Sequence, residues 1–335
     1  MKKIIQFFKK PFCFAICYTV VLVILITAIS LHAFVVPQAT VPVDYPGIQN
    51  PSQTFLDKKS AADGLDENGY GYWEQQDVIN TDGSATETYT ARGYTDENIR
   101  IEIRQYRRLA TDIYVADIKI RDVEYLKAAF AKDTYGVHIT QNTSEIAREH
   151  QAILAINGDY FGYHTESFVL RNGVTYRESA RTDAVYDNLI IGYDGSFSTV
   201  IEEPGGMEEL KDNWQVFGFG PTLLWDGQIV TGETTEVARC KASNPRTALG
   251  RFETGEDGWL HYCFVTSDGR TERSAGLTLY QLAGFLQEIG CVDGYNMDGG
   301  GSTTMVFNNE VVNLPTNGNY GIKERGVSDI VYIGY

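Results

Sequence analysis

The strongest constraint on this chain is an uncharged run near its N-terminus, extending from Pro11 to Pro37. Its centre, residues 20–26, reads Val-Val-Leu-Val-Ile-Leu-Ile. A helix of about 20 apolar residues crosses the hydrocarbon core of a bilayer, and this run is long enough to do so. Residues 1–36 are therefore predicted to form a Lys-rich flank followed by a single transmembrane anchor.

Basic residues before the run indicate its orientation. The flank carries four lysines, Lys2, Lys3, Lys9 and Lys10. Because positive flanks stay in the cytoplasm, everything after Pro37 is predicted to lie outside the cell membrane as an extracytoplasmic domain on a single-pass anchor. The alternative is a cleaved signal peptide, but Leu31, His32 and Ala33 fit a small-x-small cleavage site poorly. Both interpretations give the same extracytoplasmic location.

The charge of the remaining chain restricts its partners. After residue 36 the sequence holds 24 basic residues against 44 acidic ones, a net charge of −20. Binding to phosphate backbones needs clustered Lys and Arg, so nucleic acid is not expected as a partner. The partner predicted from this part of the sequence is the membrane, through the N-terminal helix.

Composition divides the chain after the anchor into two parts. From Val41 to Thr88 there are nine acidic residues against two lysines, mixed with Gly, Asn, Ser and Pro and without periodicity. Residues 37–88 are therefore predicted to be an acidic extracytoplasmic stalk. Alternation of Ile99, Ile101 and Ile103 with charged residues then begins a strand pattern, and residues 89–335 are predicted to form the folded domain.

Local signals within the domain predict both strands and helices. Asp-Gly turns at 194–195 and 226–227 follow strand-like runs at 188–193 and 222–225, in the manner of hairpins. Thr278 and Gln281 cap a helix that ends before Gly290, and Asn142 with Glu145 begins a shorter one before a buried strand at 152–156. The predicted fold class is α+β (mixed α/β), with a mixed β-sheet, hairpins and a C-terminal strand-helix-strand unit with a parallel crossover.

Cysteines contribute little. Outside the anchor stand Cys240, Cys263 and Cys291, which allow one disulfide and one thiol or no disulfide. Their surroundings lack the ligand spacing of zinc sites, so no structural metal is expected.

The least ordinary stretch is Asn296-Met297-Asp298-Gly299-Gly300-Gly301-Ser302. Three consecutive glycines between apolar strands are conformationally costly, which indicates positive φ angles or close approach of a ligand to the backbone. Backbone N–H groups of such a turn can bind an anion, with the Asp298 carboxylate at its entry. The competing interpretation is a tight turn, which a single Gly usually serves.

Three further stretches carry polar groups at strand ends. The first is Asn157-Gly158-Asp159-Tyr160-Phe161, whose aromatic rings suit sugar stacking, although, taken alone, an Asn-Gly turn with structural aromatics is the better explanation. The second is Pro245-Arg246-Thr247, in which Arg246 could clamp a phosphate or form a surface ion pair. The third is the turn Ser267-Asp268-Gly269-Arg270.

Together and in this order, the four stretches resemble the phosphodiester glycosidase family. That family carries an Ile-Asn-Gly-x-aromatic-Phe stretch, an Arg-Thr-Ala-aliphatic-Gly stretch, an Asp-Gly-Arg or Asp-Gly-Gln turn and an Asp-Gly-Gly-Gly-Ser loop. The resemblance covers residues 95–335 and implies hydrolysis of the bond between a sugar's anomeric carbon and a phosphate oxygen. A phosphodiester-linked glycan or wall polymer is the implied substrate.

The resemblance and the residue chemistry give a candidate site. The candidate catalytic residues are Asp298, Asp268, Glu166 and Arg246, with the carboxylates serving the sugar and Arg246 the phosphate. The candidate substrate-binding residues are Asn157, Asp159, Tyr160, Phe161, Thr247, Gly299, Gly300, Gly301 and Ser302. No cofactor is required by this chemistry, and a bound divalent cation is left open.

Two alternatives belong to other functional classes. The first is a glycan-binding or exopolysaccharide-organising protein on the same fold with idle carboxylates. The second is a metal-dependent phosphodiesterase that cleaves P–O, with Asp159, Asp268 and Asp298 around a divalent cation. Against the second, no Asp or His cluster shows two-metal spacing in the sequence.

Overall fold

The computed structural model describes residues 11–42, 79–80, 86–181, 187–203, 208–235, 237, 243–318 and 321–335. The lysine flank, Cys240 and most of the expected stalk lie outside the described residues. The α-helices are α2 (Pro11–Phe34), α4 (Thr143–Glu149) and α5 (Leu279–Glu288). Short 3-10 turns are η1 (Val123–Tyr125), η2 (Ala131–Asp133), η3 (Phe161–Tyr163), η4 (Glu208–Leu210) and η5 (Gly300–Ser302).

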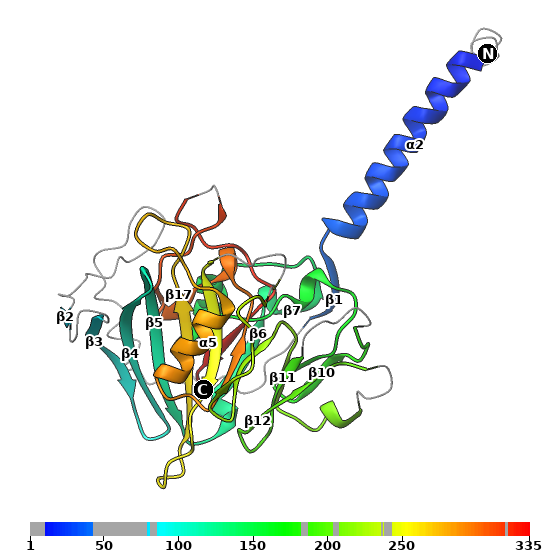
Figure 1. Cartoon of the computed structure of the whole chain (residues 1–335). Helices are drawn as coiled ribbons and strands as arrows, with labels where there is room; N and C mark the ends of the chain where they lie inside the picture. Colours follow the sequence, from blue (N-terminus) through cyan, green and yellow to red (C-terminus); the bar gives the residue numbers. More distant parts are fainter. Residues whose placement is uncertain are drawn as a thin grey trace.

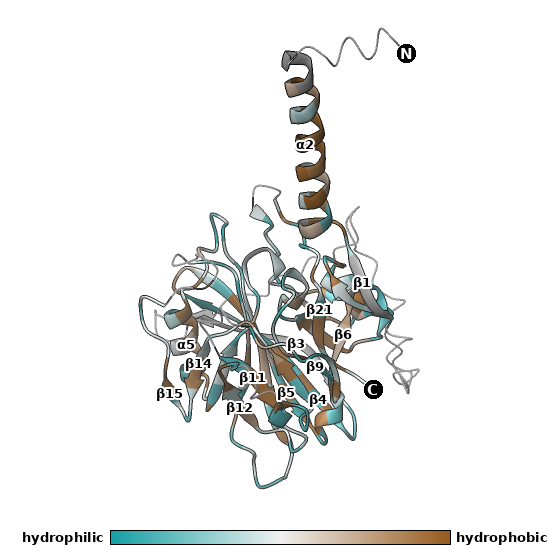
Figure 2. Ribbon diagram, turned by 90° about the vertical axis from the view of Figure 1, so that its right-hand side faces the viewer, coloured by the Kyte–Doolittle hydropathy of each residue, from teal (hydrophilic) through white to brown (hydrophobic). Residues whose placement is uncertain are grey.

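The N-terminal apolar run forms one continuous helix. α2 projects away from the domain and is hydrophobic along most of its length (Figures 1 and 2). Its segment Ala15–Ala33 is long and apolar enough to cross a membrane and is not buried by the rest of the chain. Such a helix serves as a secretory signal or an anchor.

The largest sheet has nine strands in the order β15-β14-β18-β16-β17-β5-β4-β3-β2. These are β2 (Ile79–Asn80), β3 (Thr86–Thr95), β4 (Ile99–Arg108), β5 (Thr111–Ile120), β14 (Thr222–Trp225), β15 (Gln228–Ile229), β16 (Arg246–Arg251), β17 (Leu260–Ser267) and β18 (Asp293–Asn296). α5 covers one face of this sheet (Figure 1). The predicted capping box confirms the start of α5, because Thr278 Oγ1 accepts the Gln281 N–H at 3.1 Å.

A second sheet has the order β20-β19-β8-β21-β6. Its strands are β6 (Leu126–Phe130), β8 (Leu154–Asn157), β19 (Met305–Phe307), β20 (Glu310–Val311) and β21 (Asp329–Ile333). The largest core cluster lies between the two sheets, and another lies between the second sheet and α4. The domain is thus layered as helix, sheet, sheet, helix.

A third sheet, β10-β9-β13-β11-β12, completes the domain. Its strands are β9 (Val169–Arg171), β10 (Val174–Arg177), β11 (Asn188–Ile191), β12 (Phe197–Val200) and β13 (Gln215–Phe217). The predicted hairpins are confirmed, since β11 pairs with β12 and β14 pairs with β15.

The prediction of a mixed sheet is wrong for the described strands, whose ladders are antiparallel. The strand-helix-strand unit β17-α5-β18 does form, and both of its strands run antiparallel to β16, so they point the same way. They are not neighbours, because β16 lies between them. An earlier strand therefore separates the two parallel strands of the crossover.

The first residues of the segment that composition predicted to be a stalk, residues 37–88, pair with a strand of the domain. β1 (Gln38–Pro42) pairs antiparallel with β7 (Thr134–Val137). At the other end of the expected stalk, β3 begins at Thr86 and pairs with β4.

Two of the three cysteines that follow α2 are neighbours. Cys263 and Cys291 are buried free thiols whose sulfur atoms lie 3.5 Å apart. The adjacent thiol and burial raise the pKa of Cys263, which favours its protonated form.

Candidate active site

The three-glycine loop follows β18 and packs against the segment just before β16. The Gly300 N–H donates to Pro245 O at 2.8 Å, and Gly300 has a φ of 60°. A methyl group added at Gly300 would lie 2.9 Å from Arg270 Nη2, and one at Gly299 would lie 3.0 Å from Pro245 O. The glycines are thus explained by close packing against this chain's own atoms.

The side chains of Asn157 and Thr247 hold the three-glycine loop in place through hydrogen bonds. Asn157 Nδ2 donates to Asp298 O at 2.6 Å, while Asn157 Oδ1 accepts from Thr247 Oγ1 at 2.8 Å. Both side chains are fully buried. The Asn157 amide therefore joins β8, β16 and the loop that follows β18, and that contact sets the position of Asp298.

The Asp298 carboxylate lies at the edge of the loop. Asp298 Oδ2 accepts from Ser302 Oγ at 2.6 Å and from Arg325 Nη2 at 3.1 Å. Its side chain is 13% exposed and that of Arg325 is 41% exposed. Burial raises the pKa of Asp298, and the Arg325 guanidinium and the Ser302 hydroxyl oppose that shift.

Sequence reasoning did not identify Arg325 as a site residue. Besides Asp298, its Nη2 donates to Ser302 Oγ at 2.7 Å and to Gly299 O at 3.2 Å. Arg325 follows an irregular segment without a recognisable motif, so the sequence offered no local signal for it.

Arg270, which the sequence placed only in a turn, is a second guanidinium at the loop. It is exposed, has a φ of 60°, and donates through Nε and Nη2 to Asn244 Oδ1 at 3.1 and 2.9 Å. Its Nη2 lies beside Gly300, as the distance to a methyl group added there shows. Arg270 and Arg325 thus contact different glycines of the same loop.

Arg246 lies close to the loop and is buried. It is 4% exposed, and its Nε donates to Leu277 O at 2.9 Å. Its Cδ lies 3.8 Å from the position of a methyl group added at Gly299. The structure therefore brings Arg246 beside the glycine loop, on its buried side.

Asp268 is buried in a separate environment. It is 1% exposed, and its Oδ1 accepts the Leu314 N–H at 2.8 Å. Burial raises the pKa of Asp268 to about 7, the Leu314 N–H opposes this, and nearby Asp112 adds to it. Within the described ranges no hydrogen bond joins Asp268 to Asp298. Asn313, which bonds the Asp268 carboxylate, donates to Thr303 O at 3.0 Å.

The Asn157 stretch divides into buried and accessible side chains. Asp159 Oδ2 accepts from Arg171 Nη2 at 2.8 Å and from the Gly218 N–H at 2.9 Å, and Phe161 stacks on Tyr135 in the core. Tyr160 is half-buried and Glu166 is exposed. Of the predicted site residues around this stretch, only these last two have side chains that reach solvent to any extent.

A buried charge network that sequence reasoning missed supports this stretch. Arg171, fully buried, donates to Asp159 and, through Nε at 2.8 Å, to Asp329 Oδ2. Burial raises the pKa of Asp329, and Arg171 opposes the shift. A methyl group at Gly158 would clash with Asp329 Oδ1, so this carboxyl group packs directly under the loop.

The arrangement of potential metal-ligating side chains does not support a metal site among the described residues. Among the residues that the structure describes, no group of three or more His, Cys, Asp or Glu side chains is placed to hold a metal ion. Asp159 is held by Arg171, Asp268 by the Leu314 N–H and Asp298 by Arg325. The expectation that no cofactor is required stays a prediction.

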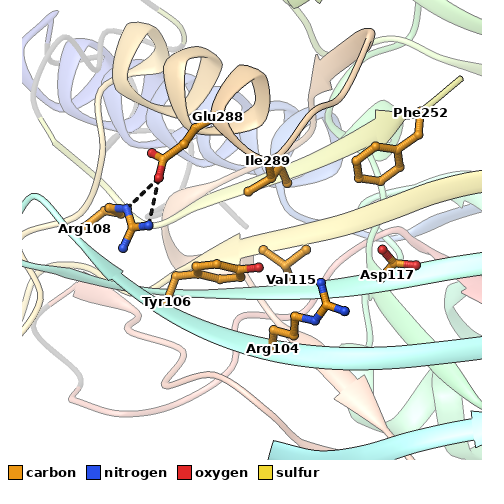
Figure 3. A pocket seen from close by; sticks show the side chains of 8 residues that line it. All are labelled: Arg104, Tyr106, Arg108, Val115, Asp117, Phe252, Glu288 and Ile289. Carbon is orange, nitrogen blue, oxygen red and sulfur yellow. Dashed lines mark hydrogen bonds and ion pairs between the residues drawn. The ribbon is translucent and has the colours of Figure 1, made fainter. Parts of the chain in front are cut away.

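A separate cavity of about 220 Å³ lies near the far end of β16, away from the glycine loop. Figure 3 shows it between α5 and strands of the large sheet; its lining residues are Arg104, Tyr106, Arg108, Val115, Asp117, Phe252, Glu288 and Ile289. Arg108 donates to Glu288 Oε1 at 2.8 and 3.0 Å, and Tyr106 packs edge-on against Phe285. It shares no residue with the candidate site.

Known proteins share both the sequence and the fold of this domain. The chain is 28% identical over 216 residues to the SPbeta prophage-derived uncharacterized protein YomE of Bacillus subtilis, covering 60% of this chain and 31% of that protein. It is 38% identical over 188 residues to N-acetylglucosamine-1-phosphodiester alpha-N-acetylglucosaminidase of Bos taurus, covering 51% of this chain and 34% of that protein. The matched region thus spans about a third of the length of these two relatives.

Solved structures extend the likeness to the fold. The catalytic domain of zebrafish N-acetylglucosamine-1-phosphodiester alpha-N-acetylglucosaminidase, auto-inhibited by its pro-peptide, superposes with a TM-score of 0.54 at 17% identity, over 75% of this chain and 88% of that one. A hypothetical protein from Synechocystis superposes with a TM-score of 0.52 at 15% identity, over 71% of this chain and 62% of that one.

The family model described as phosphodiester glycosidase matches residues 150–334. That region is more than half of the chain, and it contains the Asn157 stretch, Arg246, Asp268, the glycine loop and Arg325. On this match, the chain belongs to the phosphodiester glycosidase family.

Proposed function

We propose that this chain is a membrane-anchored, extracytoplasmic hydrolase that cleaves the sugar C1–O bond of a sugar-1-phosphodiester in a glycan or wall polymer. The observation that carries the proposal is the Asp298–Arg325 pair at the edge of the glycine loop, with Arg270 against the same loop. Cleavage develops positive charge on the sugar and negative charge on the departing phosphate. The Asp298 carboxylate is complementary to the positive charge on the sugar, and the two guanidinium groups are complementary to the negative charge on the phosphate.

Asp298 is assigned to the sugar side. Ser302 and Arg325 engage its Oδ2 at 2.6 and 3.1 Å, Arg325 Nη2 lies 3.4 Å from its Oδ1, and the Gly299 N–H donates to the carboxylate. Because each carboxylate oxygen has two lone pairs, Asp298 can still accept a hydrogen bond from an attacking water or approach the anomeric carbon. Either task needs the charged carboxylate; burial raises the pKa of Asp298, and the Arg325 guanidinium opposes that shift.

Arg325 and Arg270 are assigned to the phosphate, and Arg246 to support of the loop from its buried side. The departing phosphate monoester has a second pKa of roughly 6, so it leaves near neutral pH without a strong acid to protonate it. Binding by guanidinium groups then matters more than a second carboxylate. Asp268, buried with Leu314, and Glu166, exposed beyond the Asn157 stretch, are not required as proton donors in this scheme.

The test is hydrolysis of a panel of sugar-1-phosphodiesters by the full-length protein in water labelled with heavy oxygen. Cleavage of C1–O places the label in the released sugar, as expected. Label in the phosphate would instead establish P–O cleavage, the phosphodiesterase alternative. Saturable binding without turnover would support the glycan-binding alternative.

The Asp298→Asn variant tests the assigned carboxylate. It is nearly isosteric, and we expect kcat to fall by about 100- to 10,000-fold while the melting temperature stays close to that of the parent. Asp268→Asn is the matched comparison, with a smaller loss expected because Asp268 lies away from the exposed edge. Full activity in both variants would remove both from the mechanism and leave Glu166 as the leading carboxylate.

A further inference from the structure

The joint between α2 and the domain is short. α2 ends at Phe34 and β1 begins at Gln38, so Val35, Val36 and Pro37 are the whole connection. Four Cα steps reach at most ~14 Å. Because β1 is paired with β7, the domain is held at the end of the helix.

His138 strengthens this joint from the domain side. It follows β7 directly, and its backbone N–H donates to Gly162 O at 2.9 Å. Its Nε2 lies 3.0 Å from Ala33 O, and since a carbonyl oxygen only accepts, Nε2 carries the proton in this contact. Ala33 is in the last turn of α2, where carbonyl groups lack intrahelical partners. One residue thus joins the helix end to η3.

Exposed apolar side chains surround the joint. Val35 is 60% exposed, Val36 is 44% exposed, and Tyr163, whose ring centroid lies 6.1 Å from that of His138, is 52% exposed. We call Val35, Val36 and Tyr163 the juxtamembrane rim. Tyrosine is enriched where bilayers meet water, because its ring is apolar and its hydroxyl is polar.

The rim and the candidate site belong to the same end of the domain. Tyr163 is in the loop that begins at Asn157, whose amide holds Asp298. Beyond His138, Gln141 pairs with Val327, two residues after Arg325. In Figure 1, α2 leaves the end of the domain that carries the red C-terminal loops.

We propose that the juxtamembrane rim lies in the bilayer interface and that the site takes a sugar-1-phosphodiester whose phosphate is esterified to a membrane-embedded lipid. The substrate class rests on the proposed function, whereas contact of the rim with the bilayer rests only on the joint. The domain is strongly acidic, so anionic headgroups repel most of its surface, and contact is confined to the uncharged rim beside the anchor.

The first experiment measures lipid contact by the full-length protein in phosphatidylcholine nanodiscs. A photoreactive benzoylphenylalanine replaces Tyr163 in one variant and Tyr193 in the control. Tyr193 is 57% exposed, and it lies in the turn between β11 and β12; β12 is at the end of the domain opposite α2 (Figures 1 and 2). Lipid crosslinking at position 163 well above that at 193 is expected. Equal lipid-crosslinking yields at the two positions would overturn the proposal that the juxtamembrane rim lies in the bilayer interface.

The second experiment separates substrate class from function. Nanodiscs are supplied with one sugar-1-phosphate, esterified either to a short water-soluble alcohol or to a polyprenol in the bilayer. We expect Tyr163→Asp to slow hydrolysis of the polyprenyl ester and to leave the soluble ester unchanged, because a carboxylate is disfavoured in the interface. Cleavage of the soluble ester alone would overturn the lipid-linked substrate and leave the proposed function standing. Cleavage of neither would overturn the proposed function, and the crosslinking result would still decide the rim.

Discussion

Arg246, Arg270 and Arg325 lie at the glycine loop, and two of them, Arg325 and Arg246, differ sharply in their exposure to solvent. The Arg325 side chain is 41% exposed, whereas Arg246 is 4% exposed and bonded to a backbone carbonyl. Arg325→Lys keeps the charge but loses the planar fork, so kcat/KM should fall by roughly 30- to 1000-fold, about 2 to 4 kcal/mol, with little change in melting temperature.

Arg246→Lys provides the comparison for that variant. Because its guanidinium is buried, we expect this substitution to lower both the melting temperature and activity. Paired kinetic and thermal measurements distinguish the two arginines. Severe loss of activity in Arg246→Lys at an unchanged melting temperature, with Arg325→Lys near the parent, would move the phosphate to Arg246.

Asp268 makes stability depend on pH. Its folded-state pKa of about 7 exceeds that of an unfolded Asp, so the folded state binds more protons between about pH 4 and 7. The contribution of Asp268 to the free energy of unfolding is therefore full below about pH 4, is lost as pH rises to about 7, and is constant above. Asp268→Asn should flatten this decline, by up to a few kcal/mol, in urea titrations at about pH 4, 5.5 and 7. Parallel curves for the two proteins would contradict the assignment.

At the scale of elements, the glycine loop needs both a positive φ angle at Gly300 and close packing of that residue against Arg270. Gly300→Ala should destabilise the domain by about 1 to 2 kcal/mol, because its φ is 60° and the methyl group meets Arg270. Gly284 in α5 is the control, since a methyl group there meets nothing within 4 Å and Ala favours helix by about 1 kcal/mol. Denaturant unfolding of both variants measures the two effects; a neutral Gly300→Ala would show that the loop relaxes freely.

Elements with local signals were predictable from the sequence. α5 has a cap at Thr278 and an apolar face at helical spacing, and the hairpins have Asp-Gly turns between their strands. The order of strands in the large sheet has no such signal. β16 lies between β17 and β18 because of contacts across the sheet, and no spacing along the chain encodes that insertion.

The residues of the candidate site also divide into those with a local sequence signal and those without one. Asn157, Thr247, Asp298 and Ser302 lie in stretches that the sequence singled out, and hydrogen bonds join them in the structure. Arg325 and Asp329 come from a stretch without a motif. They reach the site because β21 pairs with β8, a contact between segments far apart in the chain.

At the scale of the whole molecule, the proposed anchoring by α2 predicts where the domain resides. Protease treatment of intact cells should remove a C-terminal tag and leave a membrane-bound fragment containing α2, since lysines precede the helix. Immunoblotting against tags at both ends measures this. A protected C-terminal tag would reverse the orientation, and released protein beginning after residue 30 would identify a cleaved signal.

The position of β21 between β6 and β8 sets an order of events during synthesis. Phe130 in β6 pairs with Asp329, so β6 cannot pair with this neighbour until a strand much later in the sequence has been translated. β8, which ends at Asn157, waits for the same strand, and Arg325 emerges just before it. Because such distant pairing is slow to form, closure of this sheet and assembly of the loop above it are one late step. A growing chain therefore cannot assemble this site before β21 has been made.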